Sequence, residues 1–267
     1  MEAVEQGKGL LVVGSPGTGK THWLRGIIAN LRQAGKRVEV IAKTHAAVQN
    51  IGCEAVTADH WVRKHVRAGG VHCSVLVVEE LTQIDVQLWG DLTLCRLKGV
   101  QMILCGDFGQ FGPVCEHWCG CAVPAGALEH SQMLWEMCGG NRLVLAENKR
   151  SDAKLFDFYT NLGDDLQSAL RRAKQLFPRT KREAAYTLTM SHSRRVTVNK
   201  LRNRQEYMQK FAKGQGPPQA VLVKAPPPTR SGNQPQDMWL WAGLELMGAG
   251  GLCKKGCSMR WPRLRLK

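Results

Sequence analysis

The sequence lacks any run of 18 apolar residues, and its amino-terminal residues lack the basic start and long apolar segment of a secretion signal. A helix that spans a bilayer needs about 20 mainly apolar residues, so the sequence predicts neither a membrane span nor secretion. Aromatic residues make up only 6% of the chain, which leaves few side chains on which nucleobases can stack.

Acidic residues are scarce beside basic ones. The 267 residues include 22 Asp and Glu against 37 Lys and Arg, a formal charge of +15. This excess favours a polyanionic partner, most simply nucleic acid, and a merely soluble basic surface is the alternative. The hydrophobic content of 43% is enough for a packed core, in one large domain or two small ones.

Paired C-x-x-C motifs are missing, although the chain has ten cysteines. Cys73, Cys95 and Cys105 lie in apolar strand patterns, which predicts buried thiols in an intracellular, reducing compartment such as the nucleus or cytoplasm. A cluster with the spacing C-x-x-x-C-x-C occupies residues 115–121 around a histidine. Because this spacing differs from that of structural zinc sites, we predict no zinc there.

The strongest signal is GSPGTGKT at residues 14–21, which fits G-x-x-x-x-G-K-T without a mismatch. An apolar strand pattern precedes it and a helix pattern follows, which is the context of a phosphate-binding loop. The glycines let amide groups point at phosphate oxygens, Lys20 reaches the β- and γ-phosphates, and the Thr21 hydroxyl ligates Mg²⁺. The predicted nucleotide-binding residues are Gly14, Gly17, Thr18, Gly19, Lys20 and Thr21.

Apolar strand patterns alternate with helix patterns through residue 180, which predicts an α/β fold with a doubly wound parallel sheet. Asp59 is expected to cap a helix that begins at residue 60. The remaining strands are predicted at 37–43, 73–78, 99–105 and 142–146, and the remaining helices at 20–34, 84–97, 152–162 and 164–176.

A second domain is predicted to begin near residue 184. A strand at 186–190 precedes a basic helix at 193–211. From residue 214 the sequence is rich in Pro and Gly, and little regular structure is expected apart from 220–224.

Polar residues follow three of the predicted strands. Glu79 and Glu80 end an apolar strand, where a P-loop enzyme needs one carboxylate to hold Mg²⁺ and a second to activate water, and we assign these roles in that order. Gln110 follows the next strand and can orient the attacking water. Arg150 follows the last strand and can neutralise transition-state charge. The alternatives are solvated carboxylates, a Gly-rich turn and a surface arginine.

Seven segments occur in an order that resembles superfamily 1 helicases, and the RecD-like, 5′-to-3′ branch in particular. The resemblance covers about residues 9–210. The segments are GSPGTGKT (14–21), KTHAAVQNIG (43–52), TADHW (57–61), LVVEEL (76–81), GDFGQFGPV (106–114), LAENKRSD (145–152) and TMSHSRRVTVNK (189–200).

The resemblance implies a RecA-like P-loop NTPase domain at residues 1–180, a partial second RecA-like domain at 184–250, and ATP and Mg²⁺ as cofactors. Lys20, Glu79, Glu80, Gln110 and Arg150 are its catalytic residues, and Thr21 and Glu79 hold the metal. The residues implied to line the path of a single strand are Thr44, His45, Trp61, Ser191, His192 and Arg195. Core packing is the alternative for Trp61.

Three features depart from the family pattern. Glu79 stands where the family usually has Asp, and Gln6 is the only candidate for the family's adenine-contacting glutamine. Motifs V and VI are missing, so we expect a C-terminally truncated helicase with a basic, disordered tail at residues 251–267.

The sequence therefore predicts an ATP-binding helicase-type motor domain that hydrolyses ATP and couples hydrolysis to binding of, or movement on, single-stranded DNA, with RNA as the alternative strand. A non-catalytic fragment that binds ATP and nucleic acid is the competing hypothesis. A small kinase is a third possibility, which the segments around Gln110 and Arg150 disfavour.

Overall fold

The computed structural model describes residues 2–113, 117–124, 126–163, 165–178, 187–211, 220–227, 236–247 and 258–260. The chain divides into two compact units, Met1–Leu176 and Phe177–Lys267. Within the described ranges, no helix combines the length and the apolar character that crossing a bilayer requires. The predicted tail at 251–267 lies outside these ranges except for residues 258–260.

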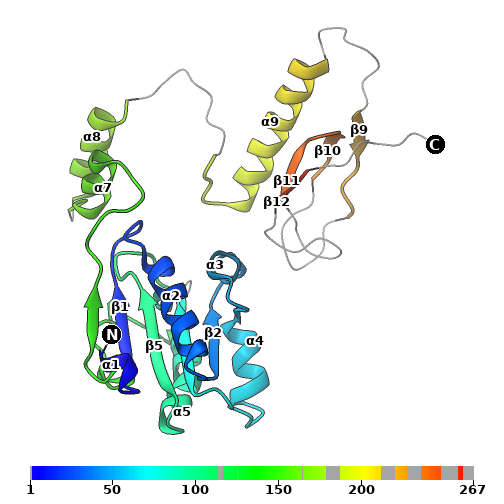
Figure 1. Ribbon diagram of the computed structural model, residues 1–267. Helices are drawn as coiled ribbons and strands as arrows, with labels where there is room; N and C mark the ends of the chain where they lie inside the picture. Colours follow the sequence, from blue (N-terminus) through cyan, green and yellow to red (C-terminus); the bar gives the residue numbers. More distant parts are fainter. Residues whose placement is uncertain are drawn as a thin grey trace. The chain divides into compact units, whose positions relative to one another are not determined.

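The first unit is built on a six-stranded sheet of order β3-β2-β4-β5-β1-β8, in which all neighbouring strands are parallel (Figure 1). Its central strands are fully buried, which suits the continuous apolar sequences that predicted them. The strands are β1 (Leu10–Val13), β2 (Val38–Ala42), β3 (Val56–Thr57), β4 (Val75–Glu79), β5 (Gln101–Gly106) and β8 (Arg142–Val144). The predicted parallel α/β sheet is confirmed.

Helices cover both faces of this sheet because alternate strand residues point to opposite sides. On one face, α1 (Glu2–Glu5), α2 (Lys20–Gln33) and α3 (His45–Ile51) contribute to the core. On the other face the core includes residues of α4 (Ala58–Trp61), the π-helical turn η1 (Val62–Val66), the 3-10 turn η2 (Leu81–Gln83), α5 (Val86–Leu97) and α6 (Gln132–Cys138). Both cores include side chains of β1, β4 and β5, the strands whose ends carry the predicted site.

One predicted detail of the first unit is wrong. The helix after β3 begins at Ala58 with Thr57 as its N-terminal flanking residue, so Asp59 lies inside the first turn and does not cap it. Its carboxylate instead binds Lys43. A two-strand hairpin, β6 (His117–Trp118) and β7 (Cys121–Ala122), also forms in the long connection that follows β5.

Cys73, Cys95 and Cys105 are buried free thiols, as predicted, but only Cys105 lies in a strand, since Cys95 is on α5 and Cys73 precedes β4. Burial raises the pKa of Cys73 to about 12 and that of Cys95 to about 11, so both thiols stay protonated at neutral pH. Cys119 and Cys121 are exposed on the hairpin, and Cys115 lies outside the described residues. Among the residues that the structure describes, no group of three metal-binding side chains occurs.

Two helices, α7 (Ala153–Thr160) and α8 (Leu166–Leu176), follow the sheet in the first unit. The Asp152 side chain caps α7, accepting a hydrogen bond of 2.8 Å from the Leu155 amide. The short loop between β8 and α7 thereby places residues 148–151 beside the phosphate-binding loop.

The second unit contains α9 (His192–Phe211) and two antiparallel strand pairs, β9 (Ala220–Val223) with β10 (Met238–Trp241) and β11 (Glu245–Met247) with β12 (Ser258–Arg260). The expected strand at 186–190 is wrong for residues 187–190, which are not in a strand, and Tyr186 is outside the described residues. The expectation of little structure after 224 is also wrong, because β10 and β11 form there. A RecA-like second domain stays a prediction.

Aromatic packing explains why β10 forms. The ring of Tyr207 on α9 stacks on Trp239, with ring centres 4.4 Å apart. The Asn203 side chain binds the Trp239 backbone at both ends, accepting from its amide at 2.8 Å and donating to its carbonyl at 2.9 Å. These contacts provide hydrogen-bond partners for the backbone of Trp239 in β10. The surrounding Pro- and Gly-rich sequence does not predict this strand.

Candidate nucleotide-binding site

The loop between β1 and α2 has the conformation that the glycine pattern predicts. Gly17 and Gly19 have φ angles of +85° and +87°, a region that side chains disfavour. The Lys20 ammonium donates hydrogen bonds to the carbonyl oxygens of Gly14, at 2.5 Å, and Ser15, at 3.1 Å. The hydroxyl of Thr18 donates to the same Ser15 carbonyl at 2.8 Å. The loop therefore curls around its own lysine.

Thr21 and Glu79 meet at the start of α2, although they are 58 residues apart in the sequence. The Thr21 hydroxyl donates to Oε1 of Glu79 at 2.7 Å. Glu79 is only 4% exposed, and within the described residues its Oε2 is buried without a hydrogen-bond partner. A buried carboxylate that retains a free oxygen beside a hydroxyl is a suitable setting for a hard cation such as Mg²⁺.

Glu80 follows β4 with a left-handed backbone, φ +53°, which is uncommon for a residue with a side chain. This conformation sends Glu80 toward the loop side of the sheet, where it lines the same cavity as Lys20. Burial raises its pKa, the neighbouring Glu79 charge raises it further, and the Lys20 charge partly offsets both. A carboxylate with a raised pKa is a better proton acceptor for water.

The strand β5 delivers Asp107 and Gln110 to this site. Asp107 is 9% exposed, and its carboxylate accepts hydrogen bonds from the Gly109 amide at 2.9 Å and from the Gln110 side chain at 3.4 Å. The Gln110 amide group is thereby held at the edge of the cavity. Sequence reasoning named Gln110 and missed its support by Asp107.

Residues 148–151 come from the end of β8 and lie against the phosphate-binding loop. The backbone amide of Lys149 donates to the Gly17 carbonyl at 2.8 Å. The Asn148 carboxamide oxygen accepts from the amides of Arg150 and Ser151, both at 3.1 Å, which closes a tight turn. Arg150 is exposed on this turn and lines the cavity.

One cavity of about 420 Å³ joins these parts. It contains every predicted catalytic residue, from four different strand ends, as the topology of a parallel sheet requires. Asp107, His22, Asn50 and Lys149 are additional lining residues that the motif search did not assign. Gly14 and Thr18, also predicted, belong to the body of the loop.

The predicted nucleic-acid contacts of the first unit have different surroundings. Thr44 caps α3 by accepting a hydrogen bond of 3.1 Å from the Ala47 amide, and His45 is exposed beside it. Both therefore stand at the carboxyl end of β2. Trp61 is 1% exposed and lies within the core, where its ring nitrogen donates to Glu39 at 2.5 Å. Its burial contradicts a direct contact with a nucleic acid, so this assignment is wrong.

Ser191, His192 and Arg195 gather at the amino-terminal end of α9 in the second unit. The Ser191 hydroxyl accepts a hydrogen bond of 3.2 Å from the Arg194 amide, and His192 is exposed. Two nitrogens of the Arg195 guanidinium, Nε and Nη2, are buried without a hydrogen-bond partner in the part of the chain that the structure describes. Their role as strand contacts stays a prediction.

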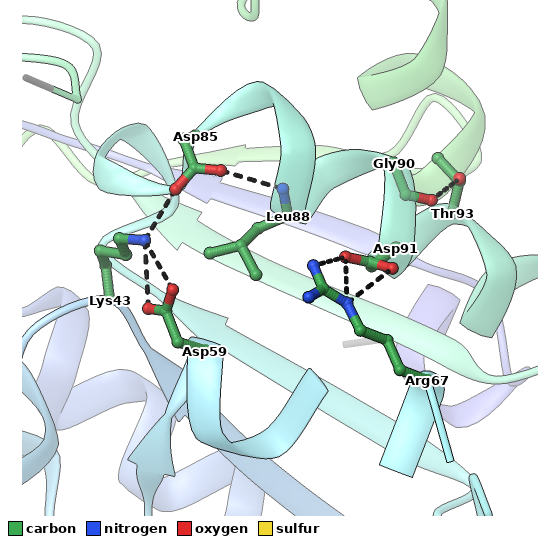
Figure 2. Close-up of polar contacts among 8 residues, drawn as sticks. All are labelled: Lys43, Asp59, Arg67, Asp85, Leu88, Gly90, Asp91 and Thr93. Carbon is green, nitrogen blue, oxygen red and sulfur yellow. Dashed lines mark hydrogen bonds and ion pairs between the residues drawn. The ribbon is translucent and has the colours of Figure 1, made fainter. Parts of the chain in front are cut away.

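An ionic cluster joins three segments next to Thr44 (Figure 2). The Lys43 ammonium lies 2.7 Å from Asp85 and 3.1 Å from Asp59. Asp85 also caps α5, accepting from the Leu88 amide at 3.0 Å. Burial opposes ionisation of Asp85, but the bonds from Lys43 and Leu88 outweigh it and lower its pKa. Burial likewise opposes the charge on Lys43, and the two carboxylates outweigh it and raise that pKa.

Replacing Lys43 with methionine is expected to lower the free energy of unfolding of the first unit by about 1–2 kcal/mol, because the partly buried carboxylate of Asp85 and the exposed carboxylate of Asp59 lose their cation. Since the folded-state pKa of Asp85 is below its ordinary 3.8, the pair stabilises the protein above that pH and loses its effect as the pH falls through the lowered pKa. Urea unfolding from pH 7 to pH 3 measures both effects.

Lys64→Met is the matched control, because Lys64 is exposed on η1. It should change stability by less than about 0.5 kcal/mol. Equal losses in the two variants at pH 7, or an unaltered acid limb in Lys43→Met, would contradict the assigned role of the cluster.

Residues 1–117 match the protein family described as an AAA domain. The human ATP-dependent DNA helicase PIF1 is 28% identical over 43% of this chain and 21% of its own length. The ATP-dependent DNA helicase PIF5 of Trypanosoma brucei brucei is 30% identical over 41% of this chain and 14% of its own length. This chain therefore spans only a minor part of these curated relatives.

Solved structures that resemble this one include two Pif1 helicases. The Pif1 helicase of Candida albicans matches with a TM-score of 0.60 and 23% identity, over 94% of this chain and 63% of that chain. A Bacteroides Pif1 structure described as bound to ssDNA matches with a TM-score of 0.57 and 14% identity, over 94% of this chain and 64% of that chain. These similarities establish a RecA-like fold. This chain is therefore similar to Pif1 helicases, in sequence over less than half of its length and in fold over 94% of it.

Proposed function

We propose that this chain carries the ATP-binding motor domain of a superfamily 1 helicase of the RecD-like, 5′-to-3′ branch, which couples ATP hydrolysis to movement on single-stranded DNA. One observation carries the proposal: Lys20, Glu79, Glu80, Gln110 and Arg150 line a single cavity at the carboxyl ends of the sheet strands. That set supplies phosphate binding, a metal ligand, a base, a water-orienting amide and a cation.

In this proposal Mg²⁺ is held by Thr21 and Glu79. The buried, unpartnered oxygen of Glu79 beside the Thr21 hydroxyl fits such an ion. When bound, Mg²⁺ neutralises phosphate charge that develops during hydrolysis. The 2.7 Å contact also shows that the longer glutamate side chain, which stands where the family has aspartate, still reaches Thr21.

The remaining residues act on water and on phosphate oxygens. Glu80, with its raised pKa, accepts the proton of the attacking water while Gln110 orients that water. The loop amides and Lys20 bind the phosphate oxygens of the nucleotide, and Arg150 neutralises charge on the transferring group.

A single strand is the proposed partner, bound through Thr44 and His45 in the first unit and Ser191, His192 and Arg195 in the second. Hydroxyl, imidazole and guanidinium donors suit a phosphate backbone, and the charge of +15 favours association with it. The relative solved bound to ssDNA supports this choice over RNA. The buried free thiols support a reducing compartment, the nucleus or cytoplasm, as the place of action.

The test is ATP hydrolysis by the 267-residue chain with Mg²⁺, measured alone, with oligo-dT and with oligo-rU, beside a Lys20→Ala control. We expect hydrolysis that oligo-dT stimulates more than oligo-rU and that the control lacks. Stimulation requires coupling between the nucleotide site and the site that binds the single strand, so it distinguishes a motor from a protein that only binds both ligands.

Two other outcomes would change the conclusion. ATP binding without hydrolysis would favour the non-catalytic fragment, which binds ATP and nucleic acid independently. Hydrolysis that neither strand affects would favour a different class of P-loop NTPase.

A further inference from the structure

A tyrosine outside the helicase-like segments bridges two parts of the candidate site. Tyr159 lies on α7, and its hydroxyl donates to the Pro16 carbonyl of the phosphate-binding loop at 2.6 Å, across 143 residues of sequence. The same oxygen lies 3.0 Å from the Ser151 hydroxyl. Because a carbonyl can only accept and a phenol has one proton, Ser151 is the donor to Tyr159 when Tyr159 binds Pro16, and this 3.0 Å contact is shorter than the 3.4 Å contact of the Ser151 hydroxyl with the Asn148 carboxamide oxygen.

These two bonds, together named the Tyr159 latch, connect the loop to the turn that carries Arg150. A Cβ atom placed on Gly17 would lie 3.3 Å from the Tyr159 hydroxyl and 3.3 Å from Cβ of Arg150. Gly17, Tyr159 and Arg150 are therefore close together. The Phe156 ring packs edge-on against Tyr159, with ring centres 5.4 Å apart, and holds the phenol in place.

The latch also fixes one peptide group of the loop, the one between Pro16 and Gly17. Peptide groups are trans and planar, so a carbonyl and the following N–H lie on opposite sides of the chain. Tyr159 binds the Pro16 carbonyl and the Lys149 amide binds the Gly17 carbonyl, both from outside the loop. The amide of Gly17 is thereby turned to the opposite side of the loop, while the amide of Thr18 donates to the Ser15 carbonyl at 3.3 Å.

We propose that Tyr159 is a positioning residue for nucleotide hydrolysis, which acts by holding the Arg150 turn and the phosphate-binding loop as one preorganised unit. This inference rests on the proposed function. Tyr159 acts through Arg150 and not through folding, since it is only partly buried and belongs to a helix without buried residues.

The test compares Tyr159→Phe with the unaltered chain, because phenylalanine keeps the ring and deletes only the hydroxyl. We expect kcat for ATP hydrolysis to fall about tenfold, given that a 1 Å misplacement near the reacting atoms costs up to about 100-fold. The Kd for ADP should rise no more than about threefold, since the Lys149 amide still holds the loop. Ser151→Ala, which removes one half of the latch, should lower kcat in the same direction by less.

Tyr207→Phe is the matched control, because it makes the same chemical change in the second unit, where the ring stacks on Trp239. It should leave kcat unchanged. The decisive measurement is the double variant with Arg150→Ala: adding Tyr159→Phe to that background should lower kcat by less than twofold.

Each contrary result has a defined meaning. Unchanged kcat in Tyr159→Phe, or a full tenfold loss in the Arg150→Ala background, overturns the latch while the proposed function stands. Loss of ADP binding together with a lowered melting temperature assigns Tyr159 a structural role and also overturns it. Absence of hydrolysis by the unaltered chain overturns the proposed function, and the latch with it.

Discussion

Replacing Glu80 with glutamine is expected to lower kcat for ATP hydrolysis by about 10²–10⁴-fold, the usual contribution of a positioned general base. Glutamine keeps the size and polarity of the side chain and cannot accept a proton. Glu79, whose contact with Thr21 is independent of Glu80, should continue to support nucleotide binding. Kd for ADP should therefore change by less than about threefold, in contrast to kcat.

The pH profile gives a second readout of the same assignment. Burial and the charge of Glu79 raise the pKa of Glu80, and a base works only when deprotonated. In the unaltered chain kcat should fall as the pH decreases through this raised pKa. In Glu80→Gln the residual rate should show no such acid limb.

Glu54→Gln is the control for this pair of measurements, because its carboxylate is 88% exposed and lies outside the cavity. It should leave the rate and the pH profile unaltered. If Glu80→Gln retains more than about a tenth of the activity, or keeps the acid limb, another group activates the water.

The sequence identified the site because its signals are local. The apolar sequences of β1, β4 and β5 are fully buried strands, and each ends at a residue that lines the cavity or leads directly to one. Parallel strands in a doubly wound sheet bring such ends to one edge, so motif order and topology together placed Lys20, Glu80 and Gln110 in one cavity. This prediction of the site required no knowledge of contacts between residues distant in the sequence.

The features that the sequence concealed depend on contacts between distant residues. Tyr159 and Pro16 are separated by 143 residues, and no sequence pattern around either residue predicts the hydrogen bond between them. Trp61 belongs to a helicase-like segment, yet its ring lies in the core. The segment alone does not show whether a residue of a short helix faces the core or the solvent. The strand β10 exists through the pairing of Trp239 with Tyr207 and Asn203 on α9, against the local composition.

Gly14→Ala is expected to lower the free energy of unfolding of the first unit by about 3 kcal/mol, at the upper end of the cost of overpacking. A Cβ built on Gly14 lies 2.4 Å from the Leu145 carbonyl oxygen and 2.7 Å from the Thr18 hydroxyl. The Thr18 side chain can rotate, but the Leu145 carbonyl belongs to backbone that the Leu145 amide ties to β1, through a 2.8 Å bond to Val13. The clash therefore moves backbone, which is expensive.

The matched control is Gly26→Ala, the same chemical change within α2, where a built Cβ has no atom within 4 Å. Alanine is the better helix former, so this variant should be more stable by about 0.5–1 kcal/mol. Calorimetry should show the two melting temperatures moving in opposite directions, with a loss of roughly 10 °C for Gly14→Ala.

The consequence for the site distinguishes this prediction from a general loss of stability. Relief of the Gly14 clash requires the loop and the segment after β8 to separate, and that segment carries the turn that contacts Gly17 through Lys149. Gly14→Ala should therefore weaken ADP binding by about tenfold even at temperatures where the variant is fully folded. A folded variant with unaltered affinity would mean that the first glycine serves only the packing of β1 against β8, and that the loop adjusts independently.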